Sequence, residues 1–244
     1  MRRRQPLKSN KLKKWLAAPY AVWAAGFIII PLILILYYAF TGEEGGFTLS
    51  NFAYVATKEN IKALGLALWL SLLSTVLCLV LAYPLAMILA NRNVNQTSFI
   101  VLIFILPMWM NFLLRTLAWQ TLLEKNGVIN SILSFFHLPG ISIINTPGAI
   151  ILGMVYNFLP FMILQIQTSL CKMDTSLLEA SADLGASPAQ TFRRITLPLS
   201  LPGVINGITL VFLPAVSSFF IPKLLGGGQY FLIGNMIENQ FITV

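Results

Sequence analysis

The feature that most constrains the fold of this chain is a series of long apolar runs without a charged residue. One run extends from Trp15 to Gly42 and another from Ala63 to Asn91. A helix of about 20 residues crosses the apolar layer of a bilayer, so each run is long enough to span it. Inside a bilayer the backbone must satisfy its own hydrogen bonds, which helices do. The sequence therefore predicts an all-α polytopic membrane protein.

Five spans are predicted from this pattern. A further apolar segment, Leu224–Ile237, is too short and glycine-rich to cross straight and is predicted to be re-entrant or interfacial. Only 10% of the residues are charged, whereas about 25% are charged in a soluble domain. The net charge of +8 is better explained by contact with an anionic leaflet than by nucleic-acid binding. The predicted spans are about Pro19–Phe40, Ala63–Asn91, Phe99–Leu123, Pro147–Leu170 and Leu201–Pro222.

The charges that flank the first span indicate its orientation. Seven basic residues lie in Met1–Lys14, ahead of the span, whereas Glu43 and Glu44 follow it. Basic residues favour the cytoplasmic side of a membrane. Residues 1–18 are therefore predicted to be a basic cytoplasmic N-terminus and residues 19–244 a transmembrane domain. The charge-free run is too long for the core of a signal peptide, so we expect the first span to be retained.

The segments between the spans carry no recognisable chemistry. Phe47–Lys62 is predicted to be a helix on the outer surface, and Asn91–Ser98 a tight link between two antiparallel spans. His137 is the only histidine, and Cys78 and Cys171 are expected to be small buried residues rather than disulfide partners or metal ligands. A P-loop, a G-x-S-x-G motif and a zinc motif are all missing from the sequence. The chain is therefore not predicted to be an enzyme or to bind a cofactor.

A polar island, Lys172–Pro198, separates the last two predicted spans. Ser176 and Glu179 have the spacing of a capping box, and Gly185 follows where a left-handed helix end is favoured. A second capping box at Ser187 predicts another helix, which Pro198 is expected to stop. Four crossings from a cytoplasmic N-terminus return the chain to the cytoplasm. The sequence therefore predicts a helix–glycine–helix unit at the inner membrane surface.

This island resembles the signature of permease subunits of ABC importers. Glu179-Ala180-Ser181, Gly185 and Ile195-Thr196-Leu197-Pro198 match the pattern EAA-x3-G-x9-I-x-LP, with a serine in place of the second alanine. The resemblance implies a type I ABC importer permease (MetI-like) bundle with a cytoplasmic coupling loop at 172–198. It also implies that Ser176–Gly185 is a coupling helix that docks on an ATP-hydrolysing subunit. The loop residues implied to serve this coupling are Ser176, Leu177, Leu178, Glu179, Ala180, Asp183, Leu184, Gly185, Ala186, Ile195 and Pro198.

Other segments are similar to the first permease subunit of spermidine/putrescine importers. They are Pro107–Asn111 with Arg115, Val155–Phe161, Leu177–Ser187 and Leu232–Asn235. That family continues through a sixth span beyond the position of Val244, so we expect a sixth span to be missing from this sequence. The resemblance implies a bacterial inner-membrane location and an ATP-binding subunit dimer that uses the ATP. It also implies a second permease and an extracytoplasmic polyamine-binding protein as partners.

Polar and aromatic residues within the spans are candidates for the substrate path. The predicted spans contain no Asp or Glu, so a polyamine would pass by cation–π contacts and carbonyl dipoles. Helix packing is an equally good interpretation of each aromatic residue. Arg115 is expected to extend to the outer interface rather than to line a pore. The candidate path residues are Trp109, Asn111, Trp119, Tyr156 and Asn157.

Two alternative functions remain open. The same architecture could import phosphonate, thiamine, sulfate or iron, because the choice of substrate rests on the resemblance. Half of an ion-coupled secondary transporter would need carboxylates within the membrane. The spans contain none, and the polar island would then have no role.

Overall fold

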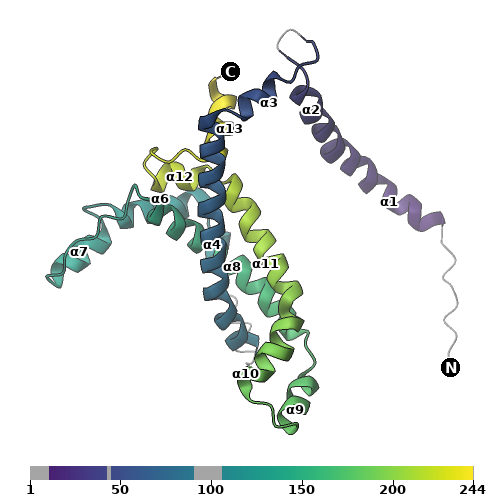
Figure 1. Ribbon diagram of the computed structural model, residues 1–244, viewed down its shortest axis with the longest axis vertical. Coiled ribbons are helices and arrows are strands. Elements are labelled where there is room, and N and C mark those ends of the chain that lie inside the picture. Colours follow the sequence, from purple (N-terminus) through teal and green to yellow (C-terminus); the bar gives the residue numbers. More distant parts are fainter. Residues whose placement is uncertain (1–10, 43–44, 91–105, 244) are drawn as a thin grey trace. The chain divides into compact units, whose positions relative to one another are not determined.

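The computed structural model describes residues 11–42, 45–90 and 106–243 (Figure 1). Contacts divide the chain into two units, residues 1–61 and 62–244, which are described separately. Within the described residues, four helices are long and apolar enough to cross a membrane: Ala18–Ala39, Lys58–Ala90, Pro147–Cys171 and Pro188–Ser217. The prediction of an all-helical, multi-span protein is therefore confirmed.

The first unit contains the predicted first span. Helix α1 (Lys11–Ala24) continues through a π-helical turn (Ala25–Ile29) into α2 (Ile30–Ala39). Pro31 lies just after this turn and has no N–H to bond the carbonyl four residues back. The Ile30 N–H bonds the carbonyl of Ala25, five residues back. This wider turn lets the helix pass the proline without a break. A short helix, α3 (Ser50–Val55), follows.

Helix α4 (Lys58–Ala90) confirms the second span but begins before its predicted start at Ala63. Phe47–Lys62 is therefore not a single surface helix, and that prediction is wrong. The side-chain amide of Asn60 donates a hydrogen bond of 2.8 Å to the carbonyl of Tyr54. This bond closes the bend between α3 and α4, which the amphipathic pattern of the segment did not show.

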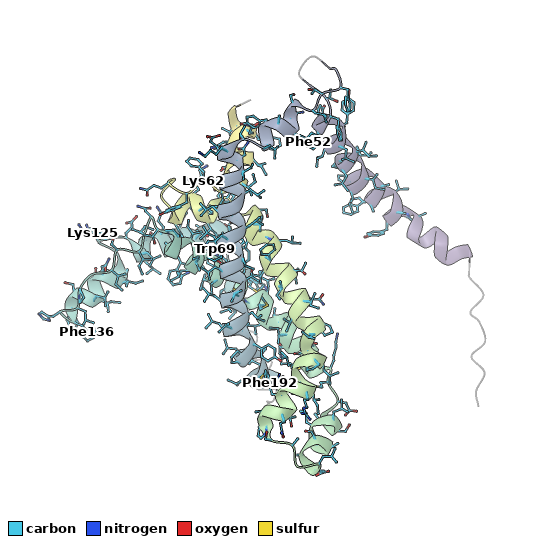
Figure 2. All side chains as sticks on the ribbon, in the orientation of Figure 1. Phe52, Lys62, Trp69, Lys125, Phe136 and Phe192 are labelled. Carbon is cyan, nitrogen blue, oxygen red and sulfur yellow. The ribbon has the colours of Figure 1, made fainter. Side chains whose placement is uncertain are left out.

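One face of α4 consists of small residues, two of which contact α8 (Pro147–Cys171). Ser74 donates to the sulfur of Met154, and the Cys78 thiol to the carbonyl of Val155. Large apolar side chains such as Trp69, labelled in Figure 2, lie on the exposed side. Small residues let membrane helices approach closely, where burial of apolar surface supplies little driving force. The buried small residues are Ala63, Ala67, Ser71, Ser74, Cys78, Ala82 and Ala86.

The predicted third span is not one continuous helix over its described part. Residues 106–109 are helical, the helix ends at Met110, and α6 (Phe112–Leu123) then begins. The side chain of Asn111 accepts a 2.8 Å hydrogen bond from the Leu113 N–H and caps the new helix. Such a cap competes with continuation of the preceding helix, so the span predicted for Phe99–Leu123 is interrupted at Met110 and Asn111. The rest of that span and the link Asn91–Ser98 lie outside the described residues.

The predicted outer segment, Glu124–Thr146, contains a helix that the sequence did not indicate, α7 (Val128–Phe135). The side chain of Asn130 donates to the carbonyls of Glu124 and Ile141 and accepts from the Ile141 N–H. One amide thus joins the start of this segment to its end. Helix α8 follows with Thr146 as its cap and Pro147 in its first turn, which confirms the fourth span.

Beyond α8 the chain forms α9 (Thr175–Asp183) and then a helix that continues from Pro188 to Ser217. The long helix comprises α10 (Pro188–Thr191), a π-helical turn (Phe192–Thr196) and α11 (Leu197–Ser217). The prediction that Pro198 stops the second helix of the polar island is wrong. As at Pro31, a π-helical turn precedes the proline, and the Leu197 N–H bonds the Phe192 carbonyl. The fifth span therefore begins inside the island and ends at Ser217, not Pro222.

Two short helices complete the second unit: α12 (Phe220–Leu225) and α13 (Ile233–Thr243). The segment Leu224–Ile237 is not a continuous helix, because the chain turns at Gly227 and Gly228, where φ is +60° and +70°. In Figure 1, α8 and α11 lie side by side, with α9 and α10 at one end of the pair and α12 and α13 at the other.

Two glycines bring α8 and α11 into close contact. A Cβ added at Gly203 would lie 2.4 Å from the Cβ of Ser169, and one added at Gly207 would lie 2.6 Å from the sulfur of Met162. Gly203 and Gly207 form a G-x-x-x-G pattern, which permits close helix packing in membranes. The sequence analysis did not use this signal.

Candidate functional site

The short loop after α8 ends with Asp174, which caps α9. Its side chain accepts a 3.0 Å hydrogen bond from the backbone N–H of Ser176. Hydrogen bonds from the Ser176 backbone and then its hydroxyl lower the pKa of the Asp174 carboxyl. The predicted capping box of Ser176 and Glu179 is therefore wrong. The helix begins at Thr175, two residues before the start that a cap at Ser176 predicts, so Asp174 becomes the cap.

The end of α9 matches the predicted left-handed glycine turn. Gly185 has a φ of +76°, its N–H bonds the Ala182 carbonyl at 2.9 Å, and the Ala186 N–H bonds the Ser181 carbonyl at 3.0 Å. These two bonds form a Schellman motif. A Cβ added at Gly185 would meet nothing within 4 Å. The cost of another residue there is therefore one of backbone strain rather than space.

A second cap and one side-chain bond join α9 to the long helix. Ser187 and Gln190 form the predicted capping box. The hydroxyls of Ser181 and Thr191 are 2.9 Å apart. Ser181 is the residue that departs from the signature, and its hydroxyl connects the two helices at that position. On the same long helix, Phe192, labelled in Figure 2, packs its ring edge-on against Tyr83 of α4 at 5.6 Å.

Apolar side chains of α9 and its turn are exposed at this end of the second unit. Leu184 is 88% exposed and Leu177 is 44% exposed. Of the predicted coupling residues, those from Ser176 to Ala186 belong to this one compact helix and turn. Ile195 lies in the π-helical turn, and Pro198 in the first turn of α11. The structure therefore presents an apolar surface on a short, well-capped helix.

The five predicted path residues do not form one lining. Only Trp119 and Tyr156 meet, with ring centroids 5.2 Å apart. Trp109 is 77% exposed, and Asn111 is used as the cap of α6. Asn157 is buried and donates to the carbonyl of Gly153 within its own helix. Sequence spacing identified polar residues within spans but did not show which way they face.

Arg115 differs from the expectation that it extends to an interface. Its side chain is only 7% exposed, and one guanidinium nitrogen donates to the carbonyl of Met110 at 3.3 Å. That carbonyl lies at the break before α6. The arginine therefore bonds the end of the helix that precedes its own.

A groove with both apolar and polar lining, not identified from the sequence, lies between α8, α11 and the start of α9. It is a cavity of about 420 Å³. Two amides inside predicted spans, Gln165 in the fourth and Asn206 in the fifth, were the signals for this groove in the sequence. Its polar and charged lining includes Gln165, Thr168, Lys172, Asp174 and Asn206.

The amides that line the groove differ from the Thr168 hydroxyl in their hydrogen bonding. Thr168 donates to the Leu164 carbonyl at 2.7 Å and is satisfied within its helix. Among the described residues, the side chains of Gln165 and Asn206 have no hydrogen-bond partner. An amide without a partner is unfavourable in lipid. These two groups can therefore bind a polar molecule or water.

Metal and redox chemistry find no support in the described part of the chain. No group of three His, Cys, Asp or Glu side chains is placed to hold a metal ion there. Cys78 is buried, as expected, but Cys171 is exposed, and both are free thiols. The prediction that Cys171 is buried is wrong, because it lies at the very end of α8.

A protein-family description matches most of the second unit. Residues 82–243 match the family "Binding-protein-dependent transport system inner membrane component". The chain is 36% identical to the spermidine/putrescine transport system permease protein PotB of Haemophilus influenzae, over 96% of this chain and 85% of that protein. It is also 36% identical to PotB of Escherichia coli K12, over 91% of this chain and 84% of that protein.

A solved structure shows the same fold. A bacterial ABC transporter involved in the import of the acidic polysaccharide alginate contains a chain that superposes with a TM-score of 0.67. The match covers 95% of this chain and 90% of that chain, at 21% sequence identity.

Proposed function

This chain belongs to the family of binding-protein-dependent transport system inner membrane components, and we propose that it carries spermidine and putrescine. It is a permease subunit of an ABC importer and not a catalytic subunit. The substrate class is supported by the PotB relatives, whose identity extends over more than nine tenths of this chain. Uptake would proceed by alternating access, with the energy supplied by ATP hydrolysis in another subunit.

The energy would enter through α9. The observation that carries this proposal is the exposure of Leu184 and Leu177 on a helix closed by two local caps. Exposed leucines outside the spans favour a protein partner, and a capped helix of this length can fill a groove on that partner. We place the loop 172–198 and the N-terminus in the cytoplasm, on the side of the ATP-binding subunits.

The links between α9 and the spans suggest how a movement would be transmitted. The bond between Ser181 and Thr191 joins α9 to the long helix, which runs without interruption to Ser217. The close contacts of Gly203 and Gly207 join that helix to α8. A displacement of α9 would thus move α8 and α11 together. The partners of this cycle would be two ATP-binding subunits, a second permease and an extracytoplasmic polyamine-binding protein.

Gly185 offers a test of substrate and coupling in one experiment. The full complex with its binding protein is reconstituted in proteoliposomes, and ATP-dependent uptake of radiolabelled spermidine is measured. Gly185→Val forces a β-branched residue to a φ of +76°, where such residues are strained by about 1–2 kcal/mol. Gly185→Asn keeps a residue that tolerates this conformation.

We expect uptake by the wild type and by Gly185→Asn, and its loss in Gly185→Val while the complex still assembles. Uptake of another solute in place of spermidine would overturn the proposed substrate class and leave the proposed coupling role intact. Full uptake by Gly185→Val would overturn the coupling role of the turn.

A further inference from the structure

The exposed side of α11 has two flanks, and one of them lines the groove. Leu201 and Ile205 are exposed on the flank outside the groove. Leu199, Pro202 and Asn206 are exposed on the other flank and line the groove, so Asn206 is the polar side chain that α11 contributes to it. Successive residues of a helix are about 100° apart, so Ile205 and Asn206 face different surroundings.

The groove offers hydrogen-bond acceptors without local partners. The amides of Gln165 and Asn206 come from two neighbouring helices, and neither has a partner among the described residues. Amide oxygens accept hydrogen bonds from ammonium groups.

One carboxylate, Asp174, lies at the mouth of the groove, and the ammonium group of Lys172 lines the same cavity. The Asp174 Oδ1 accepts the Ser176 N–H, and the Ser176 hydroxyl also hydrogen-bonds this carboxylate. A carboxylate has room for several hydrogen bonds, so capping α9 leaves Asp174 able to bind a cation. Asp174 is fully exposed, and its lowered pKa keeps it ionised at neutral pH.

We propose that this groove is the inner stage of the translocation path and takes an elongated amine cation. The amide oxygens of Gln165 and Asn206 accept hydrogen bonds from its ammonium groups, and the carboxylate of Asp174 receives one at the mouth. The cargo then contacts Asp174, the residue that caps the start of α9. The inference rests on the proposed import of polyamines and adds to it the residues that contact the cargo.

Spermidine uptake by variants with side chains of similar size tests the proposed contacts with the cargo. Asn206→Leu and Asp174→Asn are compared with the wild type in the reconstituted complex. Asn also caps helices, so Asp174→Asn removes the charge and keeps the cap. We expect each change to lower spermidine uptake by about tenfold, as for loss of a hydrogen bond to a charged group. ATP hydrolysis stimulated by the binding protein is expected to persist. The control is Thr209→Val, since the Thr209 hydroxyl already bonds the Ile205 carbonyl.

Thiol labelling tests the groove without relying on turnover. In a Cys171→Ser background, Asn206→Cys and Ile205→Cys are exposed to a cationic methanethiosulfonate from the cytoplasmic side. We expect labelling at position 206 and its suppression by spermidine, with little labelling at position 205. A groove filled by a partner helix or by lipid would leave both positions unlabelled and overturn the proposal.

The outcomes separate this inference from the proposed function. Absence of spermidine uptake in the wild type overturns the function itself. Normal uptake in both Asn206→Leu and Asp174→Asn, with uptake in the wild type, overturns only the groove. Loss of uptake in Asp174→Ala but not in Asp174→Asn assigns Asp174 to capping alone and overturns its contact with the cargo.

Discussion

The two ends of the second unit are stabilised by hydrogen bonds of different range. Around α9, the bonds from Asp174 to Thr191 join residues no more than ten positions apart. Around α12, the side chain of Asn235 donates to the carbonyl of Phe219, 16 positions away. The Asn145 N–H bonds the carbonyl of Leu225 there. Helix α9 and its turn are held by local bonds, whereas the surroundings of α12 are held by contacts between distant segments. Beyond α9, the hydroxyls of Tyr83 and Ser200, 2.7 Å apart, also join distant helices.

This difference indicates which end can move as a unit. A helix closed by its own caps keeps its shape when its surroundings change, because few of its bonds depend on other elements. The segments around α12 are joined by hydrogen bonds to several other elements, which hold them in place. We therefore expect α9 to transmit a displacement, while the opposite end resists one.

The contact between α8 and α11 connects the two ends, so a substitution that disrupts it should lower the stability most. Gly203→Ala places a Cβ 2.4 Å from the Cβ of Ser169 and 2.7 Å from the Gln165 carbonyl. Overpacking of this kind costs about 1–3 kcal/mol, and we expect a lower Tm of the purified complex. Gly65→Ala is the matched control, because a Cβ at Gly65 meets nothing within 4 Å. An unchanged Tm for Gly203→Ala would contradict the close packing.

Asn235→Ala should weaken the long-range end by a similar or smaller amount. The change removes the bond to the Phe219 carbonyl and the one that the side chain accepts from the Leu232 N–H. Leaving such buried groups without partners costs about 1–3 kcal/mol. Phe241→Ala, at an 83% exposed position of the same helix, is the control. Equal urea midpoints for the two variants would show that Asn235 does not hold this end.

Ser181→Ala should have a small effect at the local end. It removes the bond to Thr191, worth about 0.5–1.5 kcal/mol, and introduces a better helix former, which offsets part of that loss. A double-mutant cycle with Thr191→Val isolates the coupling between the two hydroxyls. A coupling energy of zero would remove this link from the path between α9 and the spans.

The cap of α9 should depend on pH only under acidic conditions. Because the carboxyl pKa of Asp174 is lowered from its ordinary value of 3.8, its contribution is complete above that pH. It is lost as the pH falls through the lower value in the folded protein. Amide exchange in α9, corrected for its intrinsic pH dependence, should therefore rise only below about pH 4. The rise should be absent in Asp174→Asn.

Sequence reasoning succeeded where structure is specified locally. The apolar runs predicted the four long spans found among the described residues, and Gly185 and the Ser187 box were placed correctly. Each of these features depends on residues a few positions apart, so a single sequence contains the whole signal.

Sequence reasoning failed where the structure depends on the surroundings of a proline or on a contact between distant segments. Pro198 was expected to stop a helix, but a π-helical turn absorbs it. Asn111 caps a new helix inside a predicted span. The direction of Asn157 and the existence of the groove depend on how α8 packs against its neighbours. Sequence spacing alone does not contain that information.

The most direct test of the central claim measures the contact between α9 and the ATP-binding subunits. Leu184→Asp places a charge on the most exposed leucine of the loop. Ala189→Asp places the same charge at an exposed position in the first turn of α10, where an acid suits the helix dipole. ATP hydrolysis stimulated by the binding protein is measured in complexes of verified composition. We predict that stimulation is lost in Leu184→Asp and kept in Ala189→Asp. Full stimulation in Leu184→Asp would contradict the assignment of α9 as the coupling helix.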